Sequence, residues 1–565
     1  MALKPYDFQP PFHAEEFITK PSSDPEEAIE VGVLFVGGGP AGLAGAIHLA
    51  QLLENEPELM ESLGEMPIVV VEKGKYPGAH LMSGAVVNPS PFFKLFPDLS
   101  IADFPFYQPV TGEAVYFLTE NRAFKFPITP PTMRNHGNYV ASVSRIGQWL
   151  AEKAEEMGIM ILNETAAVKV LVDNGAVQGI HTDDKGLDRD GQPGSNYEPG
   201  VDILAKATVI AEGTLGHLSQ TILQHFNVRR PNPQIYALGV KEIWEVKKPL
   251  DHILHTMGWP LRTAKKYREF GGSFIYPMGD DKVTVGLVVG MDYADASLSV
   301  HDLLQMFKLH PLVKDILQGG KRLEKGWGAK TIPEGGYHSL PEKLHVPGAI
   351  LTGDAAGFVN VPALKGVHYA MWSGIFAAQA IFEALKAGKD PRESDALAVY
   401  DEKVHNSFMW QELYQVRNMR PAFQYGFWKG SLLAGLMSLT SGKFPTGNMR
   451  LQNDSEHPIF LEKRDYPKPD NTYTFDKLNS VYASGNRSRD TMPNHLMLKR
   501  EVPEEIGELW IHMCPAGVYE WETTESGKKV IRINAPNCVH CGAITAKGGR
   551  FTPPEGGAGP EYSET

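Results

Sequence analysis

The stretch that decides the fold reads Val31-Gly-Val-Leu-Phe-Val36-Gly-Gly-Gly-Pro-Ala-Gly42, and an apolar run that ends at Leu53 follows it. Residues 31–36 are apolar and rich in valine, which is typical of a short buried strand. Residues 43–53 have the apolar spacing of a helix. The sequence therefore predicts a strand, a G-x-G-x-x-G turn and a helix in direct succession.

Each glycine of this turn has a physical role. Gly37 permits the tight turn, Gly39 lets the backbone approach a pyrophosphate, and Gly42 lets the helix pack closely on the strand. The phosphates would meet the free N–H groups at the positive end of the helix. A second apolar run, Ile68–Val71, ends at Glu72, whose carboxylate can accept hydrogen bonds from ribose hydroxyls. These features predict a dinucleotide-binding domain.

Two later segments favour FAD over NAD. Residues 207–213 form an apolar run that ends in Ala-Glu-Gly, with Gly213 as the last residue. Residues 348–357 predict a strand that delivers Asp354 to a glycine-rich helix start, where its carboxylate can bind ribityl or ribose hydroxyls. An ordinary turn in which Asp354 caps a helix is the alternative for this segment alone. The order of the three segments predicts a flavoprotein.

All three cysteines lie in the last tenth of the chain, at Cys514, Cys538 and Cys541. Their spacing suits iron-sulfur ligation, but a ferredoxin-type run places another cysteine three positions after the second one of the pair, with two residues between them. Ile544 stands at that position. From the cysteines alone, a zinc site or three unrelated thiols remain open.

Length and charge restrict the class of protein. A chain of 565 residues predicts more than one domain. The formal net charge of −13 gives no basic surface for nucleic acid, and three cysteines are too few for a disulfide framework. We therefore expect no nucleic-acid partner and a reducing, intracellular compartment. The apolar stretch 31–53 contains three glycines and a proline near its start, so it is not interpreted as a membrane span.

Several further stretches resemble the electron transfer flavoprotein-ubiquinone oxidoreductase family, from about residue 30 to the C-terminus. They are Gly78-Ala-His-Leu-Met-Ser-Gly-Ala85, Ala211-Glu-Gly-Thr-Leu-Gly-His-Leu218, Gly271-Gly-Ser-Phe-Ile-Tyr276, Gly286-Leu-Val-Val-Gly-Met-Asp-Tyr293, Glu334-Gly-Gly336, Asn360-Val-Pro362 with Lys365-Gly366, Cys514-Pro-Ala-Gly-Val-Tyr-Glu520 and Pro554-Glu-Gly-Gly557.

The resemblance implies a mixed α/β fold, in which a Rossmann-like FAD domain is interleaved with a β-sheet quinone domain and followed by a ferredoxin-like cluster domain. The expected boundaries are 30–230 for the first part of the FAD domain, 231–345 for the quinone domain, 346–450 for the FAD return with a membrane-associated segment, and 451–565 for the cluster domain. It also implies cofactor and quinone residues beyond the glycine turn. Ser83, Gly84, Gly357 and Asn360 would surround the flavin, and Gly271 and Gly272 would hold the quinone head group.

The implied activity is electron transfer without a catalytic side chain. Reduced electron transfer flavoprotein would pass electrons through a [4Fe-4S] cluster and FAD to ubiquinone or menaquinone. Because Ile544 replaces a thiolate, three alternatives remain open. The cluster could take a fourth ligand from His540, His512, Thr545 or solvent. It could instead be a three-iron cluster, or there could be no cluster. A reductase or hydroxylase of the geranylgeranyl-reductase type, or a non-catalytic flavin subunit of a membrane complex, is the alternative.

A membrane-facing segment is expected at residues 423–439, which are apolar and aromatic with a single lysine, Lys429. Glycines break the segment, and it is too short to span a bilayer, so it suits an interfacial position. A buried core helix is the alternative. The expected location is the inner face of a bacterial cytoplasmic membrane, or else the mitochondrial inner membrane. Residues 183–200 are rich in turn formers and predict a surface loop.

Overall fold

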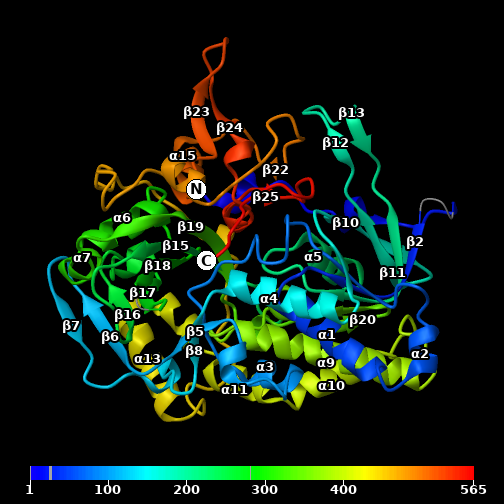
Figure 1. Cartoon of the computed structure of the whole chain (residues 1–565). Helices are drawn as coiled ribbons and strands as arrows, with labels where there is room; N and C mark the ends of the chain where they lie inside the picture. Colours follow the sequence, from blue (N-terminus) through cyan, green and yellow to red (C-terminus); the bar gives the residue numbers. More distant parts are fainter. Residues whose placement is uncertain (1, 25–27, 280) are drawn as a thin grey trace.

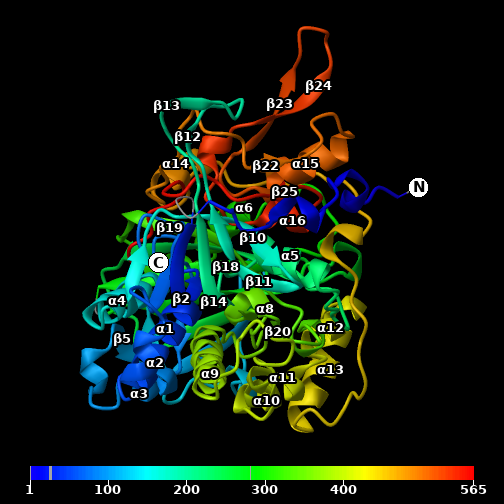
Figure 2. The same cartoon turned by 90° about the vertical axis from the view of Figure 1, so that its right-hand side faces the viewer.

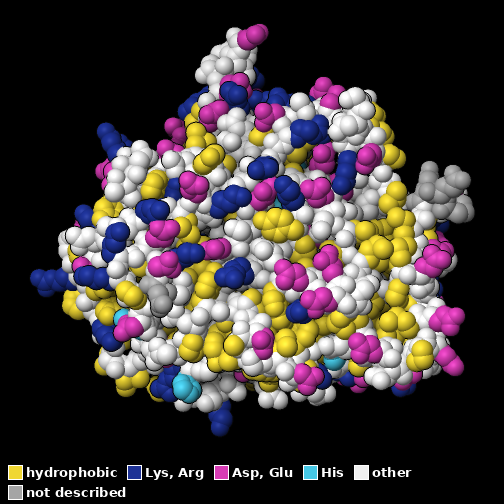
Figure 3. Space-filling model, in the orientation of Figure 1, with side chains coloured by type: hydrophobic (Ala, Val, Ile, Leu, Met, Phe, Trp, Pro, Cys, Tyr) yellow, Lys and Arg dark blue, Asp and Glu magenta, His cyan; other side chains and the backbone are white. Residues whose placement is uncertain are grey.

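The computed structural model describes residues 2–24, 28–279 and 281–565. Figures 1 and 2 show two large sheets with helices packed below them and the C-terminal residues, coloured orange and red, above them. Over the face drawn in Figure 3, basic and acidic side chains are interspersed.

The larger sheet has the strand order β1-β10-β11-β14-β2-β3-β9, with β21 pairing on β14 and β20 on β21. Strands β2, β3, β14 and β21 run parallel, so Val36, Val71, Ile210 and Leu351 end at one edge. The strands are β1 (Ile18–Thr19), β2 (Ala28–Val36), β3 (Ile68–Val71), β9 (Met160–Leu162), β10 (Ala167–Asp173), β11 (Ala176–Thr182), β14 (Asp202–Ile210), β20 (His345–Val346) and β21 (Ala349–Leu351).

Long helices cover this sheet, and two of them cross at very short distance. Helix α1 (Pro40–Leu53) packs against α9 (Val367–Lys386) and α4 (Val143–Glu156). A Cβ on Gly374 of α9 would lie only 2.0 Å from the carbonyl oxygen of Ala41. The crossing therefore requires glycine at 374, and it holds the start of α1 at the carboxyl edge of the sheet.

The second sheet has the order β19-β15-β18-β17-β16-β6-β7 and is antiparallel except between β16 and β6. Two of its strands come from the first 230 residues, so the two sheets are interleaved in sequence. Helices α6 (Val300–Leu309) and α7 (Pro311–Leu317) accompany it. Its strands are β6 (Glu113–Leu118), β7 (Ala123–Lys125), β15 (Tyr236–Glu245), β16 (Ile253–Gly258), β17 (Gly271–Pro277), β18 (Lys282–Gly290) and β19 (Lys321–Pro333).

The C-terminal residues form small paired strands and short helices that share a hydrophobic core with the second sheet. Thr331 of β19 donates its backbone N–H to the carbonyl of Cys541 at 3.0 Å. The N-terminal segment reaches the same region, where the Gln9 side chain donates to the carbonyl of Thr545 at 3.0 Å. The elements are α14 (Lys477–Tyr482), α15 (Glu504–Met513), α16 (Ala543–Ala546), β22 (Leu496–Met497), β23 (Tyr519–Thr523), β24 (Lys529–Ile533) and β25 (Arg550–Phe551).

The remaining elements are short and lie between these units. Contrary to the loop prediction, residues 183–200 contain a two-stranded hairpin, because Lys185 and Leu187 pair with Glu198 and Pro193. The other elements are α2 (Pro57–Glu61), α3 (Ser90–Leu95), α5 (His217–His225), α8 (Gly353–Ala356), α10 (Val399–His405), α11 (Phe408–Val416), α12 (Met419–Ala422), α13 (Phe427–Leu439), β4 (Val86–Val87), β5 (Phe106–Pro109), β8 (Tyr139–Ala141), β12 (Lys185–Leu187) and β13 (Pro193–Glu198).

Candidate flavin and cluster site

A cavity of about 350 Å³ lies at the carboxyl edge of the parallel strands. Its wall takes residues from the glycine turn, from the second sheet and from the C-terminal residues. Those that carry the argument are Gly37, Gly39, Glu72, Ser83, Gly84, Gly213, Phe274, Tyr276, Lys330, Asp354, Lys365, His540 and Phe551. The structure thus brings most of the predicted FAD residues together around one space.

The glycine turn has the geometry that a pyrophosphate cradle needs. Gly37 has φ +117° and donates its N–H to the carbonyl of Val71 at 2.9 Å. A Cβ on Gly42 would lie 2.1 Å from the Gly37 carbonyl oxygen, so α1 can start here only with glycine. Above Gly39 the space is open, since a Cβ there would meet no atom closer than 3.8 Å. Gly37 and Gly42 therefore form the tight turn and the close packing, and their part in binding a pyrophosphate stays a prediction.

Glu72 stands at the end of β3 with its carboxylate directed into the turn. Its oxygens accept the backbone N–H of Gly38 at 2.9 Å and that of Gly74 at 2.6 Å. Burial raises the pKa of Glu72, while the Gly74 N–H and the nearby Lys73 oppose that rise. The carboxylate is therefore held rigidly beside Gly39, where a ribose would follow the pyrophosphate.

Asp354 lies in the first turn of α8 and accepts a hydrogen bond from the Thr214 hydroxyl at 3.1 Å. Burial raises the pKa of Asp354. Gly357 and Asn360 are not part of the cavity wall in the described chain. The Asn360 side chain instead donates to the hydroxyl of Tyr369 at 3.2 Å. These two residues shape the loop behind the wall.

The glycine pair predicted for quinone begins β17, with Gly271 opposite Val289 and Gly272 opposite Val288. Further along this strand, Phe274 and Tyr276 stack on one another with ring centroids 4.8 Å apart and line the cavity. At its other end, the Phe270 ring lies 4.7 Å from that of Phe423. Strand β17 therefore connects the cavity to the segment 423–439.

Two partly buried lysines in the cavity wall had no site role assigned from the sequence. Lys330 of β19 donates to the carbonyl of His540 at 3.1 Å, and burial lowers its pKa to about 8. Lys365 donates to the side chain of Asn135 at 2.6 Å, and burial lowers its pKa to about 8 as well. A single lysine in a strand or loop has no sequence signature, so only the fold could reveal these positions.

The three cysteines come together in the C-terminal residues. The pKa of Cys538 is raised by burial and then by the neighbouring Cys541 and Cys514, and burial raises that of Cys541 to about 12. Backbone N–H groups point at the sulfurs, as in the Val518 N–H to Cys514 Sγ contact of 3.4 Å. Clustered thiols with N–H donors, of which those of Cys514 and Cys538 are buried and that of Cys541 is partly buried, suit the thiolate ligands of an iron-sulfur cluster.

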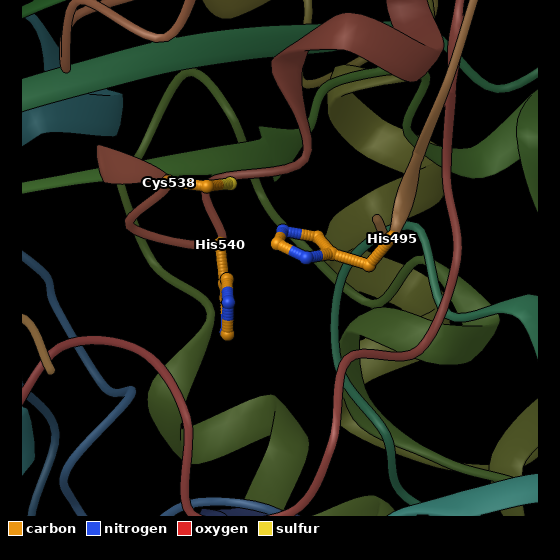
Figure 4. A group of neighbouring side chains, drawn as sticks. All are labelled: His495, Cys538 and His540. Carbon is orange, nitrogen blue, oxygen red and sulfur yellow. The ribbon is translucent and has the colours of Figure 1, made fainter. Parts of the chain in front are cut away.

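Two histidines lie beside Cys538 (Figure 4). One ring nitrogen each of His495 and His540 and the Cys538 sulfur lie within 4.8 Å of one another, whereas the three thiols form no such group among the described residues. All four ring nitrogens of the two histidines are buried without a hydrogen-bond partner. The three thiols are spaced more widely than that group, and this spacing suits ligands of different irons in one cluster better than ligands of a single ion.

The fold and the site define an FAD-dependent oxidoreductase with an appended iron-sulfur domain. Two family models match the chain. "ETF-QO, ubiquinone-binding" covers residues 236–332, and "Electron transfer flavoprotein-ubiquinone oxidoreductase, 4Fe-4S" covers residues 471–563. These matches lie inside the sequence ranges expected for the quinone and cluster domains.

Relatives of known name match almost the whole chain. The mitochondrial electron transfer flavoprotein-ubiquinone oxidoreductase of Dictyostelium discoideum is 39% identical over 97% of this chain and 93% of that protein. The human mitochondrial protein of the same name is 38% identical over 95% of this chain and 89% of that protein. A probable electron transfer flavoprotein-ubiquinone oxidoreductase from Acinetobacter baylyi is 37% identical over 95% of this chain and 98% of that protein. The chain belongs to the electron transfer flavoprotein-ubiquinone oxidoreductase family.

A solved structure shares the fold at lower sequence similarity. A geranylgeranyl bacteriochlorophyll reductase-like protein from Thermoplasma acidophilum is 19% identical, with a TM-score of 0.54 over 76% of this chain and 95% of that one. The likeness concerns the fold alone. The near full-length relatives favour the quinone oxidoreductase reading over the geranylgeranyl-reductase alternative.

Proposed function

We propose that this chain accepts electrons from reduced electron transfer flavoprotein and passes them through an iron-sulfur cluster and FAD to ubiquinone. The observation that carries the proposal is the shared cavity wall. It joins the glycine turn to His540 of the cluster loop and to Phe274 and Tyr276 of the quinone-domain strand. One space thus adjoins the loop that carries Cys538 and Cys541 on one side and the strand proposed for quinone on another.

The residues of the chain supply binding and electrostatics in this scheme. Bound FAD supplies the exchange between one-electron and two-electron steps. Gly37, Gly39 and the start of α1 would bind its pyrophosphate, and Glu72 a ribose. Lys330 and Lys365 place partly buried cationic groups in the wall, where they stabilise added negative charge.

Quinone binding is proposed at the start of β17. Gly271 and Gly272 let this strand pack closely on its neighbours, since a Cβ would lie 2.0 Å from the Val288 carbonyl oxygen and 2.5 Å from that of Thr256, and the quinone head group would bind beside this strand start. The contact of Phe270 with Phe423 supports this placement, because it connects the glycine pair to an exposed apolar surface. Ubiquinone is the proposed acceptor, and menaquinone is the alternative.

The test is a reconstituted electron-transfer assay. The purified chain is mixed with reduced electron transfer flavoprotein and a short-chain ubiquinone, and quinol formation is followed. The expected result is turnover that depends on both partners, with no oxidation of NADPH. NADPH oxidation without the flavoprotein would favour the reductase alternative. No turnover from a flavin- and iron-loaded chain would refute the proposed reaction.

We further propose that an exposed apolar surface, comprising Phe124, Ile128, Trp428, Leu432 and Leu439, lies on the membrane. Leu439 is 83% exposed, Ile128 70%, Trp428 67% and Leu432 65%. The Trp428 ring lies 5.7 Å from that of Phe117 in β6, which joins the β6–β7 hairpin to α13. A surface with this many large apolar side chains is typical of a binding face.

Figure 2 shows α13 at the bottom of the molecule, far from the β23–β24 hairpin at the top. Among the described residues, no helix combines the length and apolarity needed to cross a bilayer. The proposed location is the inner face of a bacterial cytoplasmic membrane, with the mitochondrial inner membrane as the alternative.

Membrane contact is testable by flotation with vesicles of neutral and anionic phospholipid. A Leu432→Ser, Leu439→Ser double variant should lose most vesicle binding and keep its flavin. Tyr482→Ser is the matched control, because Tyr482 is 85% exposed on α14 in the cluster domain. Equal flotation of the double variant and wild type would refute this membrane face.

A further inference from the structure

The position at which ferredoxin-type spacing expects the fourth cluster ligand holds an aliphatic side chain. In a [4Fe-4S] cluster each of the four irons takes a ligand, and ferredoxin-type spacing places the last one of the run at position 544. Ile544 is only 4% exposed and belongs to the same buried apolar cluster as Cys514 and Cys538. Its carbon atoms have no lone pair to donate to iron.

Neighbouring polar side chains already have partners. The Thr545 hydroxyl accepts the backbone N–H of Phe551 at 3.0 Å. The His512 ring nitrogen Nε2 lies 3.3 Å from the carboxylate of Glu508 on the same helix. Neither side chain is free to replace the missing thiolate without breaking an existing contact.

The histidine beside the thiols faces the cavity. The His540 ring packs against His80 with centroids 5.4 Å apart and against Phe551 at 5.5 Å, and it lines the FAD cavity. A Cβ on Gly559 would lie 2.6 Å from His540 Nδ1, so the ring occupies a tight slot. One of its ring nitrogens also lies within 4.8 Å of the Cys538 sulfur (Figure 4).

The position of His495 also does not suit a ligand of the fourth iron. Its ring nitrogen lies within 4.8 Å of the Cys538 sulfur and of His540, whereas the three thiols are not all that close to one another. The ligands of different irons in one cluster stand further apart than the ligands of a single ion. An imidazole this near Cys538 is therefore at the wrong separation to bind another iron of the same cluster.

We propose that three thiolates, from Cys514, Cys538 and Cys541, hold the cluster, and that the fourth iron, facing Ile544, has no protein ligand and is exchangeable. Loss of this iron balances without any oxidant, because [4Fe-4S]²⁺ gives [3Fe-4S]⁰ and Fe²⁺. Added Fe²⁺ reverses the step. The inference rests on the proposed function only in assigning a cluster to this domain.

The test measures iron rather than turnover. Full-length protein is purified anaerobically, its flavin, iron and sulfide are determined, and it is incubated with a ferrous chelator. Ferricyanide then oxidises any three-iron cluster by one electron to the paramagnetic [3Fe-4S]⁺, which low-temperature electron paramagnetic resonance detects. Wild type should release one iron of four and show this signal, and Fe²⁺ with a thiol reductant should remove the signal.

Variants at position 544 test whether the missing thiolate is the reason that one iron is exchangeable. Ile544→Cys should retain all four irons and show no three-iron signal, while Ile544→Val should behave as wild type. If Ile544→Cys fails to fold, as judged by its flavin content, the wild-type measurement still decides. Four irons that resist the chelator in wild type would overturn the proposal. The proposal would also be overturned if iron were released only from a His495→Gln variant, or if the purified protein contained zinc and no sulfide. Exchangeable iron in a protein that does not reduce quinone would refute only the proposed function.

Discussion

Replacing Arg420 by methionine should destabilise the protein strongly, because this guanidinium neutralises two buried carboxylates. Arg420 lies in α12, just before the exposed apolar segment. Its Nε donates to Glu334 at 2.7 Å and a terminal nitrogen donates to Asp292 at 2.8 Å. The guanidinium also lies 4.1 Å from the centre of the Phe270 ring. All three charged side chains are buried.

The pKa values give the magnitude. Burial favours the neutral form of Asp292, but Arg420 and Arg268 outweigh it and lower the pKa of Asp292 from 3.8 to about 2. This difference corresponds to about 2.5 kcal/mol of favourable interaction. For Glu334 the effect of burial is larger than that of Arg420, so the pKa of Glu334 is raised. Removing one partner of such a buried pair costs about 3–5 kcal/mol, which is the loss expected for Arg420→Met.

The pH dependence of this loss has a definite sign. In wild type, the stabilisation from Asp292 is present above pH 3.8 and disappears as the pH falls through 2, because its folded pKa is the lower one. In Arg420→Met, Glu334 loses its cation and Asp292 keeps only Arg268, so the folded pKa values of both carboxyls rise relative to wild type. The variant can then bind protons as the pH falls, and its deficit should be smaller at pH 5 than at pH 7.5.

Urea unfolding of wild type and Arg420→Met, followed by tryptophan fluorescence at both pH values, measures the deficit. Arg487→Met is the matched control. Arg487 is 71% exposed and 3.5 Å from Glu561, so its loss should cost under about 1 kcal/mol. A deficit below about 1 kcal/mol for Arg420→Met at pH 7.5, or an equal deficit at pH 5, would refute the reasoning.

Three further substitutions test other parts of the structure. Gly42→Val should abolish FAD binding, measured as flavin absorbance per protein, because its Cβ would lie 2.1 Å from Gly37; Gly435→Ala, with open space around it, should keep full flavin. Lys330→Met should lower the flavin or cluster reduction potential by tens of millivolts in a redox titration, because it removes a partly buried cation from the cavity wall, whereas Lys330→Arg should change it little. Burial lowers the pKa of Lys241 from 10.5 to about 7, so wild type should gain about 2–3 kcal/mol of stability between pH 7 and 9 in denaturant titrations. Lys241→Met should lack that gain, and parallel pH curves would contradict this assignment.

The nucleotide-binding unit was predictable from sequence because its signals are local. Strand β2, the turn and α1 are contiguous, and the spacing of Gly37 and Gly42 follows from backbone sterics. Glu72 was predictable for the same reason, since it ends the next apolar run. The hairpin in residues 183–200 was missed because its polar residues have turn-forming composition, and pairing of Lys185 with Glu198 leaves no alternation of apolar side chains.

The cavity wall beyond the glycine turn was not predictable from local signals. Lys330 reaches the carbonyl of His540 across 210 residues of sequence, and Lys365 reaches Asn135 across 230. Such contacts depend on how two interleaved sheets meet. The exposure of Trp428 and Leu439 also required the fold, because an apolar segment has the same composition in a core as on a surface.

The contact between the first and last parts of the chain sets the order of events during synthesis. Gln9 binds the carbonyls of Thr545 and Gly549, 536 and 540 residues later. Strand β21 joins the larger sheet only after about 350 residues have emerged. Because a ribosome adds residues one at a time, the N-terminal segment must wait for nearly the whole chain before it finds its partners.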